Sequence, residues 1–164
     1  MDRPVVVMSA LAGELGLLRA EMTDGRKVHA GGHRFEVGTI GGLDVVVTSV
    51  GVGKVNAAMV ATLAIDHFAP REVLFTGVAG AVDPVLGIGD VVVAEHVLHH
   101  DTGVFGPDGF AIYQSGHVPF FNPTDTIGYR PSLELLDRAR SAPTPRTNAV
   151  ILLPVYLVTP ATSP

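Results

Sequence analysis

The chain has 164 residues, enough for one domain with a sizeable core. Hydrophobic residues make up 47% of it and charged residues only 16%, a balance that indicates buried strands and tight turns rather than disorder. The net charge of −5 argues against binding to a nucleic-acid backbone, and the lack of cysteine excludes disulfides and thiolate metal sites.

Neither the first residues nor the most apolar run has the pattern of a membrane or export signal. "MDRPVVVMSALAGE" lacks a charged region ahead of a long apolar segment. "AVILLPVYLV" (149–158) is too short to cross a bilayer and contains Pro154. The sequence therefore predicts a cytoplasmic protein without membrane contact.

The first fifty residues predict strands and one short helix. Residues 4–10, "PVVVMSA", are an unbroken β-branched run, as expected for a strand buried on both faces. Residues 13–22 have leucines at helical spacing. Residues 33–40 and 43–50 are predicted to form a hairpin, because two adjacent glycines separate two apolar strand patterns.

A helix and two further strands are predicted next. Residues 54–68 have helical spacing, and Pro70 follows the end of this helix. Residues 72–77 and 89–100 have the composition of strands. The apolar stripe expected to face the core consists of Val55, Met59, Leu63 and Phe68.

The order strand, helix, strand over residues 43–77 predicts a βαβ crossover. The expected fold is therefore α/β, with a mixed, mostly parallel sheet flanked by helices. Ligands of such sheets bind at the carboxyl ends of the strands. If the strands are parallel, the loops Ser9–Glu14, Gly51–Lys54 and Thr76–Ala81 share that edge.

Regularity decreases after residue 104. Residues 103–125 are predicted as a long aromatic loop and residues 131–140 as a short helix that begins with proline. After Ala142 the sequence becomes rich in proline and threonine. We therefore expect one α/β domain over residues 1–142 and an atypical C-terminal tail over residues 143–164.

The stretch "SVGVGKVNAA" (49–58) has the look of a nucleotide-binding loop. It fails as a dinucleotide fingerprint, because Asn56 stands at the third glycine position and no acidic residue ends the next strand. It fails as a Walker loop, because the glycines are too close and Val55 follows Lys54. A tight strand-to-helix turn remains, whose backbone N–H groups could still meet a polar ligand.

A cluster of polar residues at 96–101 raises the question of a metal site. His96 and His100 would share one face of a strand, beside His99 and Asp101. A zinc site needs three or four converging ligands, and no further spaced set is present. A polar strand end is the preferred interpretation, and we expect no metal and no cofactor.

Glu14 is the carboxylate of greatest interest. It follows an apolar strand and several small residues, so it is expected near a strand's carboxyl end. It could complement the dipole of the following helix. It could equally act as a general base or stabilise positive charge in a reaction.

Three segments together resemble the methylthioadenosine/S-adenosylhomocysteine nucleosidases. They are "MSALAGELGLLRAEM", "SVGVGKVNAAMVATLAIDHFAP" and "FTGVAGAVDPVLGIGDVVVAEHVLHHD". They are similar to the family's strand–Glu–helix segment, its S-G-I-G-K-x-x-A-A segment and its T-G-x-A-G-x…G-D-x-V-V…H-D segment. The resemblance implies the nucleoside phosphorylase/nucleosidase fold and hydrolysis of the N-ribosidic bond of a purine nucleoside.

The resemblance also implies roles for individual residues. Glu14 matches the family's water-activating glutamate, and Val52 matches the apolar residue against the 5′-substituent. The remaining matches line the base and the sugar: Ser9, Ala10, Gly53, Thr76, Val78, Ala79 and Gly80. The loop "LFTGVAGA" has no arginine to bind phosphate, which favours a hydrolase over a phosphorylase.

Two departures from the family leave the substrate and the assembly open. Val78 stands where adenosine-type nucleosidases often have serine, so futalosine hydrolase is an alternative. The aromatic loop at 103–125 reaches a partner subunit's site in the family. Phe105, Tyr113 and Phe120 could therefore contact a partner in a homodimer, or simply pack the loop down.

The third departure concerns catalysis. The family continues with a V-E-M-E-type segment, whose glutamate holds the ribose, and an S-D-type segment, whose aspartate protonates the base. Neither is found here, and no Asp or Glu follows Asp137. The sequence therefore also permits an inactive, truncated relative that binds a nucleoside or a homologous subunit.

Overall fold

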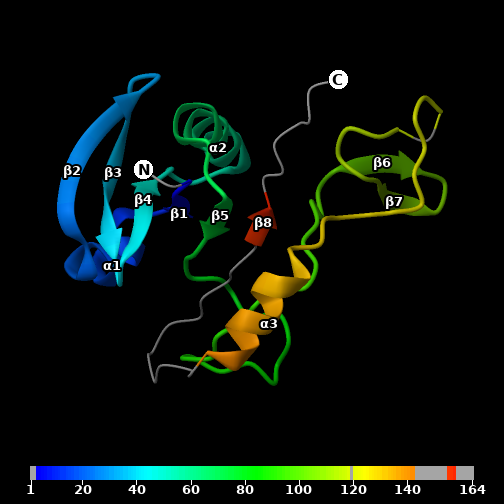
Figure 1. Ribbon diagram of the computed structural model, residues 1–164. Helices are drawn as coiled ribbons and strands as arrows, with labels where there is room; N and C mark the ends of the chain where they lie inside the picture. Colours follow the sequence, from blue (N-terminus) through cyan, green and yellow to red (C-terminus); the bar gives the residue numbers. More distant parts are fainter. Residues whose placement is uncertain (1–2, 119, 143–154, 158–164) are drawn as a thin grey trace.

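A six-stranded sheet forms the centre of the protein, as a computed structural model of residues 3–118, 120–142 and 155–157 shows (Figure 1). The strands follow one another in the order β2-β3-β4-β1-β5-β8. Their bounds are β1 (Val5–Ser9), β2 (Thr23–Ala30), β3 (His33–Ile40), β4 (Leu43–Ser49), β5 (Glu72–Phe75) and β8 (Val155–Leu157).

Parallel pairing is confined to the middle of this sheet. β1 pairs in parallel with β4, where Val6 is opposite Val46, and with β5, where Val6 is opposite Val73. The pairings β2–β3, β3–β4 and β5–β8 are antiparallel. The mixed sheet and the predicted crossover are confirmed: β4 leads through α2 (Lys54–Phe68) to β5, on the other side of β1.

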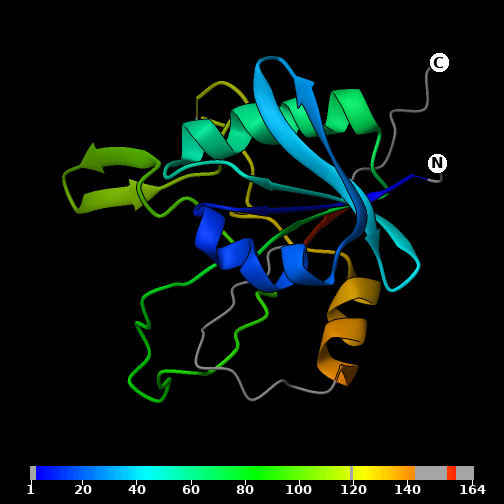
Figure 2. The ribbon, with the colours of Figure 1, turned by 90° about the vertical axis from the view of Figure 1, so that its left-hand side faces the viewer.

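Helices cover both faces of the sheet (Figure 2). Because side chains alternate along a strand, Val6 and Val46 pack toward α2, while Val7 and Val47 pack toward the opposite face. That opposite face is covered by the 3₁₀ turn η1 (Ala12–Leu15) and the short helix α1 (Gly16–Glu21). The central strands are therefore buried on both sides, as their β-branched runs indicate.

The apolar stripe predicted for α2 is half wrong. Val55 and Met59 are 82% and 54% exposed, whereas Val60 and Ala64 are completely buried. The helix meets the sheet through a neighbouring face that contains several alanines, since small side chains let the helix pack closely. The exposed part of the stripe is left on the surface of the chain.

Three other predictions are corrected by the structure. Residues 23–30 form β2, a strand that the sequence did not indicate. Residues 89–100 form no long strand: Val97 pairs with Tyr129 in an isolated bridge, and the described residues offer no neighbouring ladder. The predicted loop 103–125 contains a hairpin of β6 (Gly103–Gly106) and β7 (Gly109–Ile112), because Pro107 and Asp108 provide a turn.

The last two elements of the described chain are α3 and β8. The predicted helix at 131–140 is α3 (Leu133–Ser141), and in Figure 1 both α3 and the hairpin lie on the β8 side of the sheet, apart from each other. Residues 143–154 and 158–164 of the predicted tail lie outside the described residues, so the domain boundary stays a prediction. In the described part of the chain, no helix is long and apolar enough to cross a membrane.

Candidate active site

Three loops meet at the carboxyl edge of the parallel strands, as the sequence predicts. The amide nitrogens of Val50 and Gly51 donate to the carbonyls of Ser9 (2.8 Å) and Ala10 (3.0 Å). The amide of Thr76 donates to the carbonyl of Met8 at 2.9 Å. These hydrogen bonds extend the pairing of β1 with β4 and β5 beyond the strands, and so bring the loops after all three strands together.

Glu14 joins two of these loops through its carboxylate. Oε2 accepts a hydrogen bond from the amide of Leu11 at 2.7 Å, within its own turn. Oε1 accepts one from the amide of Val78 at 2.9 Å, in the loop after β5. The carboxylate is therefore oriented by the backbone, and each oxygen still has a lone pair with which to accept from a water molecule.

Gly77 makes room for this carboxylate. A Cβ atom at that position would lie 2.8 Å from Oε1 of Glu14, which is closer than real Cβ contacts come. The sequence interpretation gave Gly77 no role of its own. A glycine directly after Thr76, at the end of a buried strand, was the available signal, because such a position indicates close approach of another group.

Two predicted site residues, Ser9 and Thr76, are buried. The hydroxyl of Ser9 donates to the carbonyl of Leu11 at 2.8 Å and so fixes the start of the turn that holds Glu14. Ser9 is completely buried and Thr76 is 9% exposed. Contact of either residue with a substrate stays a prediction.

The glycine loop makes the tight strand-to-helix turn that the sequence predicts. Gly51 and Gly53 have φ values of 85° and 111°, a region that side chains other than glycine rarely adopt. Asn56, at the position that excluded a dinucleotide fingerprint, donates through Nδ2 to the carbonyl of Val52 at 2.9 Å. Val52 is 73% exposed at the apex of the turn, so its side chain is available to a ligand.

An ion pair connects this turn to the segment before the hairpin. Nζ of Lys54 lies 2.5 and 2.7 Å from the two carboxylate oxygens of Asp101. The hydrogen bond from Lys54 holds the pKa of Asp101 below its usual value. Both side chains are more than half exposed, so the pair orients the surface rather than stabilising the core.

The residues of the loop after β5 form an open rim next to Glu14. Val78 is 67% exposed, Ala79 is half-buried and Gly80 is exposed. With Ala10, which is half-buried, and Gly53, which is exposed, they surround the point where the three loops meet. The rim is accessible to a small molecule.

The remaining predicted residues are the histidine cluster and the partner contacts. Nδ1 of His99 is 2.6 Å from the hydroxyl of Ser115, and no group of three or more possible ligands for a metal occurs among the described residues. Phe105 packs on Phe110 in the hairpin and is 82% exposed, and Phe120 is 91% exposed. Tyr113 is half-buried.

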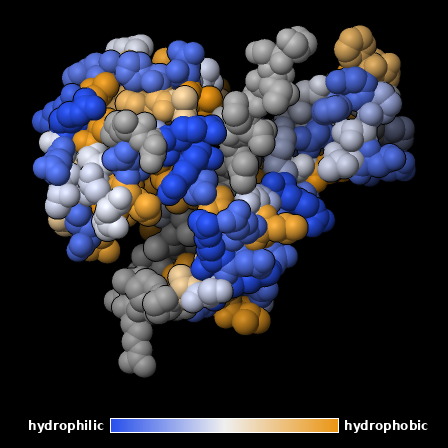
Figure 3. All heavy atoms as spheres, viewed as in Figure 1, coloured by the Kyte–Doolittle hydropathy of each residue, from blue (hydrophilic) through white to orange (hydrophobic). Residues whose placement is uncertain are grey.

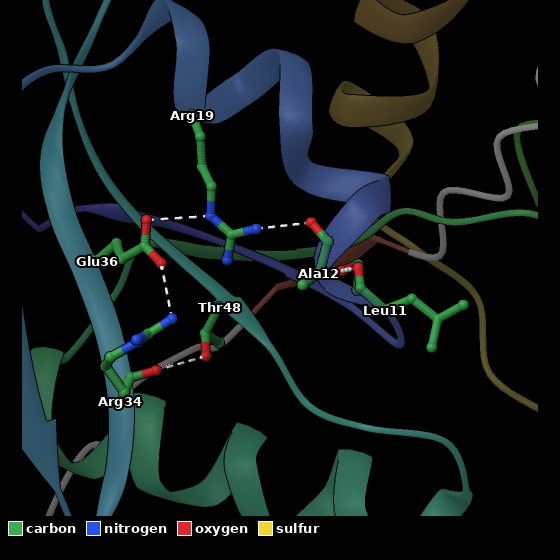
Figure 4. Close-up of polar contacts among 7 residues, drawn as sticks. Leu11, Ala12, Arg19, Arg34, Glu36 and Thr48 are labelled. Carbon is green, nitrogen blue, oxygen red and sulfur yellow. Dashed lines mark hydrogen bonds and ion pairs between the residues drawn. The ribbon is translucent and has the colours of Figure 1, made fainter.

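A polar network that the sequence did not reveal joins Ala12, in the turn of Glu14, to β3 (Figure 4). Arg19 on α1 donates through Nη1 to the carbonyl of Ala12 at 2.6 Å and through Nε to Oε2 of Glu36 at 3.0 Å. Nη2 of Arg34 lies 3.7 Å from the other oxygen of Glu36. These residues come from α1, η1 and β3, and no local sequence pattern connects them.

Comparison with known proteins agrees with this arrangement. The phosphorylase superfamily matches the chain over residues 4–145. The chain belongs to this superfamily. Within the superfamily, its similarity is to the 5′-methylthioadenosine/S-adenosylhomocysteine nucleosidases, so the resemblance found in the sequence is confirmed.

Curated relatives are similar over much of this chain. The nucleosidase of Mycobacterium tuberculosis (strain CDC 1551 / Oshkosh) is 39% identical over 136 residues, which are 83% of this chain and 53% of the relative. That of Marinomonas sp. (strain MWYL1) is 42% identical over 113 residues, or 69% and 47% of the two chains. The chain thus spans about half the length of the curated relatives it matches.

Solved structures of nucleosidases share the fold. The enzyme from Colwellia psychrerythraea 34H, in complex with adenine, has a TM-score of 0.74 and 29% identity, covering 93% of this chain and 60% of that one. The enzyme from Neisseria meningitidis, in complex with methylthio-immucillin-A, has a TM-score of 0.72 and 33% identity, covering 90% and 61%. The predicted nucleosidase-like fold is confirmed.

Proposed function

We propose that this chain contains the water-activating and nucleoside-binding part of a purine nucleosidase. The proposed substrates are nucleosides of the 5′-methylthioadenosine or S-adenosylhomocysteine type, and the reaction hydrolyses their N-ribosidic bond. One observation supports this most directly: the Glu14 carboxylate lies where three loops meet, oriented by the amides of Leu11 and Val78.

The chemistry of the reaction suits that carboxylate. Cleavage of an N-ribosidic bond develops positive charge on the sugar, and an oriented carboxylate both stabilises that charge and takes a proton from the attacking water. We assign this role to Glu14. No metal and no cofactor is part of the proposal.

The rim residues are assigned to the nucleoside. Val52 would pack against the 5′-substituent, and Val78, Ala79 and Gly80 would lie beside the base and the sugar, with Ala10 and Gly53 next to them. Ser9 and Thr76 are buried behind these residues, and we propose that they too contact the substrate. Because Val78 is apolar and exposed, futalosine is included among the substrates to be tested.

Release of the free base tests the proposal. The purified protein is incubated with methylthioadenosine, S-adenosylhomocysteine and futalosine, and the products are separated by chromatography. Glu14→Gln should reduce base release about 100-fold or more, because general-base help of this kind contributes that much. Glu21→Gln, on the exposed end of α1, is the matched control and should retain activity. Equal activity of Glu14→Gln and the wild type would overturn the assignment.

A second candidate is binding of the nucleoside without turnover. The leaving base needs a proton donor, and the described contacts of the Glu14 carboxylate are the backbone amides of Leu11 and Val78 rather than a second acid. Under this alternative, calorimetry would detect binding of methylthioadenosine while chromatography detects no base. Absence of both binding and release would exclude the two candidates together.

We also propose that the chain forms a homodimer. Val52, Val55 and Met59 leave an apolar stripe exposed near the start of α2, and Phe105 and Phe120 expose aromatic rings. Tyr113 follows directly after the β6–β7 hairpin, is half-buried, and belongs to this proposed contact. Exposed apolar patches of this kind mark interaction sites.

Sedimentation equilibrium tests the dimer. Met59→Glu should shift the protein from dimer to monomer, because it places a charge in the proposed contact. Leu17→Glu is the control, since Leu17 is 76% exposed on α1, at the opposite face of the sheet. A wild-type protein that sediments as a monomer would contradict the proposal.

A cytoplasmic location stays a prediction, which cell fractionation would test.

A further inference from the structure

The turn that contains Glu14 is weakly held from within. η1 has four residues, and its N-terminal neighbour Leu11 offers no capping side chain. Leu11, Ala12 and Gly13 are exposed, while Leu15 at the end of the turn is completely buried. Short 3₁₀ turns have poorer hydrogen-bond geometry than α-helices. Apart from the local hydrogen bonds at Leu11, the position of Glu14 therefore depends on contacts that reach the turn from outside.

Arg19 makes such a contact. Its side chain reaches back over seven residues, and Nη1 donates to the carbonyl of Ala12 at 2.6 Å. Nε of the same guanidinium donates to Oε2 of Glu36 at 3.0 Å, in β3 (Figure 4). The rigid, planar fork of arginine suits this double role, because two donors of one group point to two separate acceptors.

Glu36 is a firm anchor for this contact. It lies in the paired part of β3, opposite Val47 of β4, so its backbone is fixed in the sheet. The side chains of Arg19 and Glu36 are 25% and 21% exposed, so solvent screens this pair less than a fully exposed one. Arg34 faces Glu36 from the more exposed side, at 3.7 Å, and does not reach η1.

We infer that Arg19 is a positioning residue for Glu14. Its guanidinium ties the Ala12 carbonyl to β3, and thereby keeps the Glu14 carboxylate between the amides of Leu11 and Val78. The inference rests on the proposed function, because that function assigns Glu14 the activation of water. Since Arg19 acts through the backbone of η1, its loss should lower turnover more than nucleoside binding.

Amide hydrogen exchange tests the positioning without any need for activity. In Arg19→Met, the amides of Leu11 and Val78 should exchange roughly 10-fold faster or more, because their charged acceptor is no longer held in place. In the control Arg34→Met, which also removes a cation beside Glu36, both rates should stay within about 2-fold of wild type. Unchanged exchange at Leu11 and Val78 in Arg19→Met overturns the inference.

Kinetics then distinguish positioning from general stability. Arg19→Met should lower kcat about 10- to 100-fold, with KM changed less than about 3-fold, since small displacements of a catalytic group have effects of this size. In Arg19→Ala, added methylguanidinium should restore part of kcat. A rise in KM as large as the fall in kcat would contradict the inference, and so would the failure of methylguanidinium to raise kcat in Arg19→Ala.

A second variant, Glu36→Gln, tests the same contact from its other side chain. Glu36→Gln retains an acceptor for Arg19 but removes the charge. The exchange rates of the Leu11 and Val78 amides in Glu36→Gln should therefore lie between those of the wild type and those of Arg19→Met. If Arg19→Met does not fold, Glu36→Gln must show the faster exchange at Leu11 and Val78, or the inference fails. If the wild type releases no base, the proposed function fails, while the exchange rates still decide the role of Arg19.

Discussion

Two regions of the chain, residues 5–75 and residues 78–142, differ in how they use apolar side chains. The first builds the sheet, in which Val6, Val46 and Val47 are all but inaccessible to solvent. In the described part of the second region, the buried apolar residues are Ala94, Pro131 and Leu136, whereas Val82 and Ile88 are both 97% exposed. Apolar side chains reach the surface around α3 and near the hairpin (Figure 3).

The difference follows from the layers that each region can form. The inner strands of the first region, β3, β4, β1 and β5, have neighbours on both sides, and helices cover both faces of the central strands, so their apolar side chains have a layer to pack against. Among its described residues, the second region has a two-stranded hairpin, the bridge between Val97 and Tyr129, and the helix α3. A hydrophobic sequence therefore indicates burial only where a second layer exists, and the exposed apolar side chains of the second region are available to a partner.

The largest expected effect comes from removing a large side chain from the first region. Phe35 is completely buried, and its ring meets those of Phe68 and His33 edge-on, at 5.1 and 5.0 Å. Phe35→Ala should lower the free energy of unfolding by about 3–5 kcal/mol, through lost contacts and the cavity left behind. Urea denaturation measures this value.

The same substitution in the second region is the matched control. Phe105→Ala, in the hairpin, should change the free energy of unfolding by less than about 0.5 kcal/mol, because the side chain is 82% exposed. Equal losses in the two variants would mean that the hairpin is as tightly packed as the sheet, and the contrast between the regions would be wrong.

The same contrast determines what could be predicted from the sequence. β1, β3, β4 and α2 were expected within a few residues of their observed bounds, because β-branched runs and helical spacing are local signals. β2 was missed, because its residues "TDGRKVHA" are mostly polar and exposed, and its pairing with β3 is what makes it a strand. Residues 89–100 were expected as a strand, but strand formation also needs a neighbour.

Prediction of the site was limited in the same way. The convergence of the loops around Glu14 followed from strand order, and the resemblance to the nucleosidases supplied its chemistry. The bond from Val78 to Glu14, the space left by Gly77 and the contact of Arg19 with Glu36 depend on distances between elements. Residues that are far apart in sequence leave no local pattern.

A smaller effect is expected at the boundary between the two regions, where Gly77 faces Glu14. Gly77→Ala places a methyl group 2.8 Å from Oε1 of Glu14, so the carboxylate must move away from the amide of Val78. We expect kcat/KM for base release to fall about 10- to 100-fold, with the fold retained.

Gly16→Ala provides the control for this effect. No atom lies within 4 Å of the position that its Cβ would take, and it begins a helix, where alanine is favoured. Activity and melting temperature should therefore stay at or slightly above the wild-type values. Full activity of Gly77→Ala would show that Glu14 needs no contact with the second region.

The smallest effect concerns the pH dependence of the first region, through His33. Its Nε2 lies 2.8 Å from the hydroxyl of the buried Thr48, and that hydroxyl donates to the carbonyl of Arg34 at 3.0 Å. Because the hydroxyl has one proton, Nε2 of His33 must be the donor, so a further proton would go to Nδ1. Burial, and secondly the charge of Arg34, lower the pKa of His33 in the folded protein.

The sign of the pH effect follows from this lowered pKa. Below the ordinary histidine pKa of about 6.5, the unfolded chain binds a proton at His33 that the folded chain resists, so stability decreases as the pH falls through the folded-state pKa. In His33→Gln, whose amide can still donate to Thr48 but does not titrate, this loss should be absent. Urea denaturation between pH 8 and pH 5 should therefore show the wild type losing stability relative to the variant. If the stability of the wild type and of His33→Gln changed with pH in the same way, protonation of His33 would not disturb the pairing of β3 with β4. The well-packed region, residues 5–75, would then tolerate a charge as easily as the more exposed region, residues 78–142.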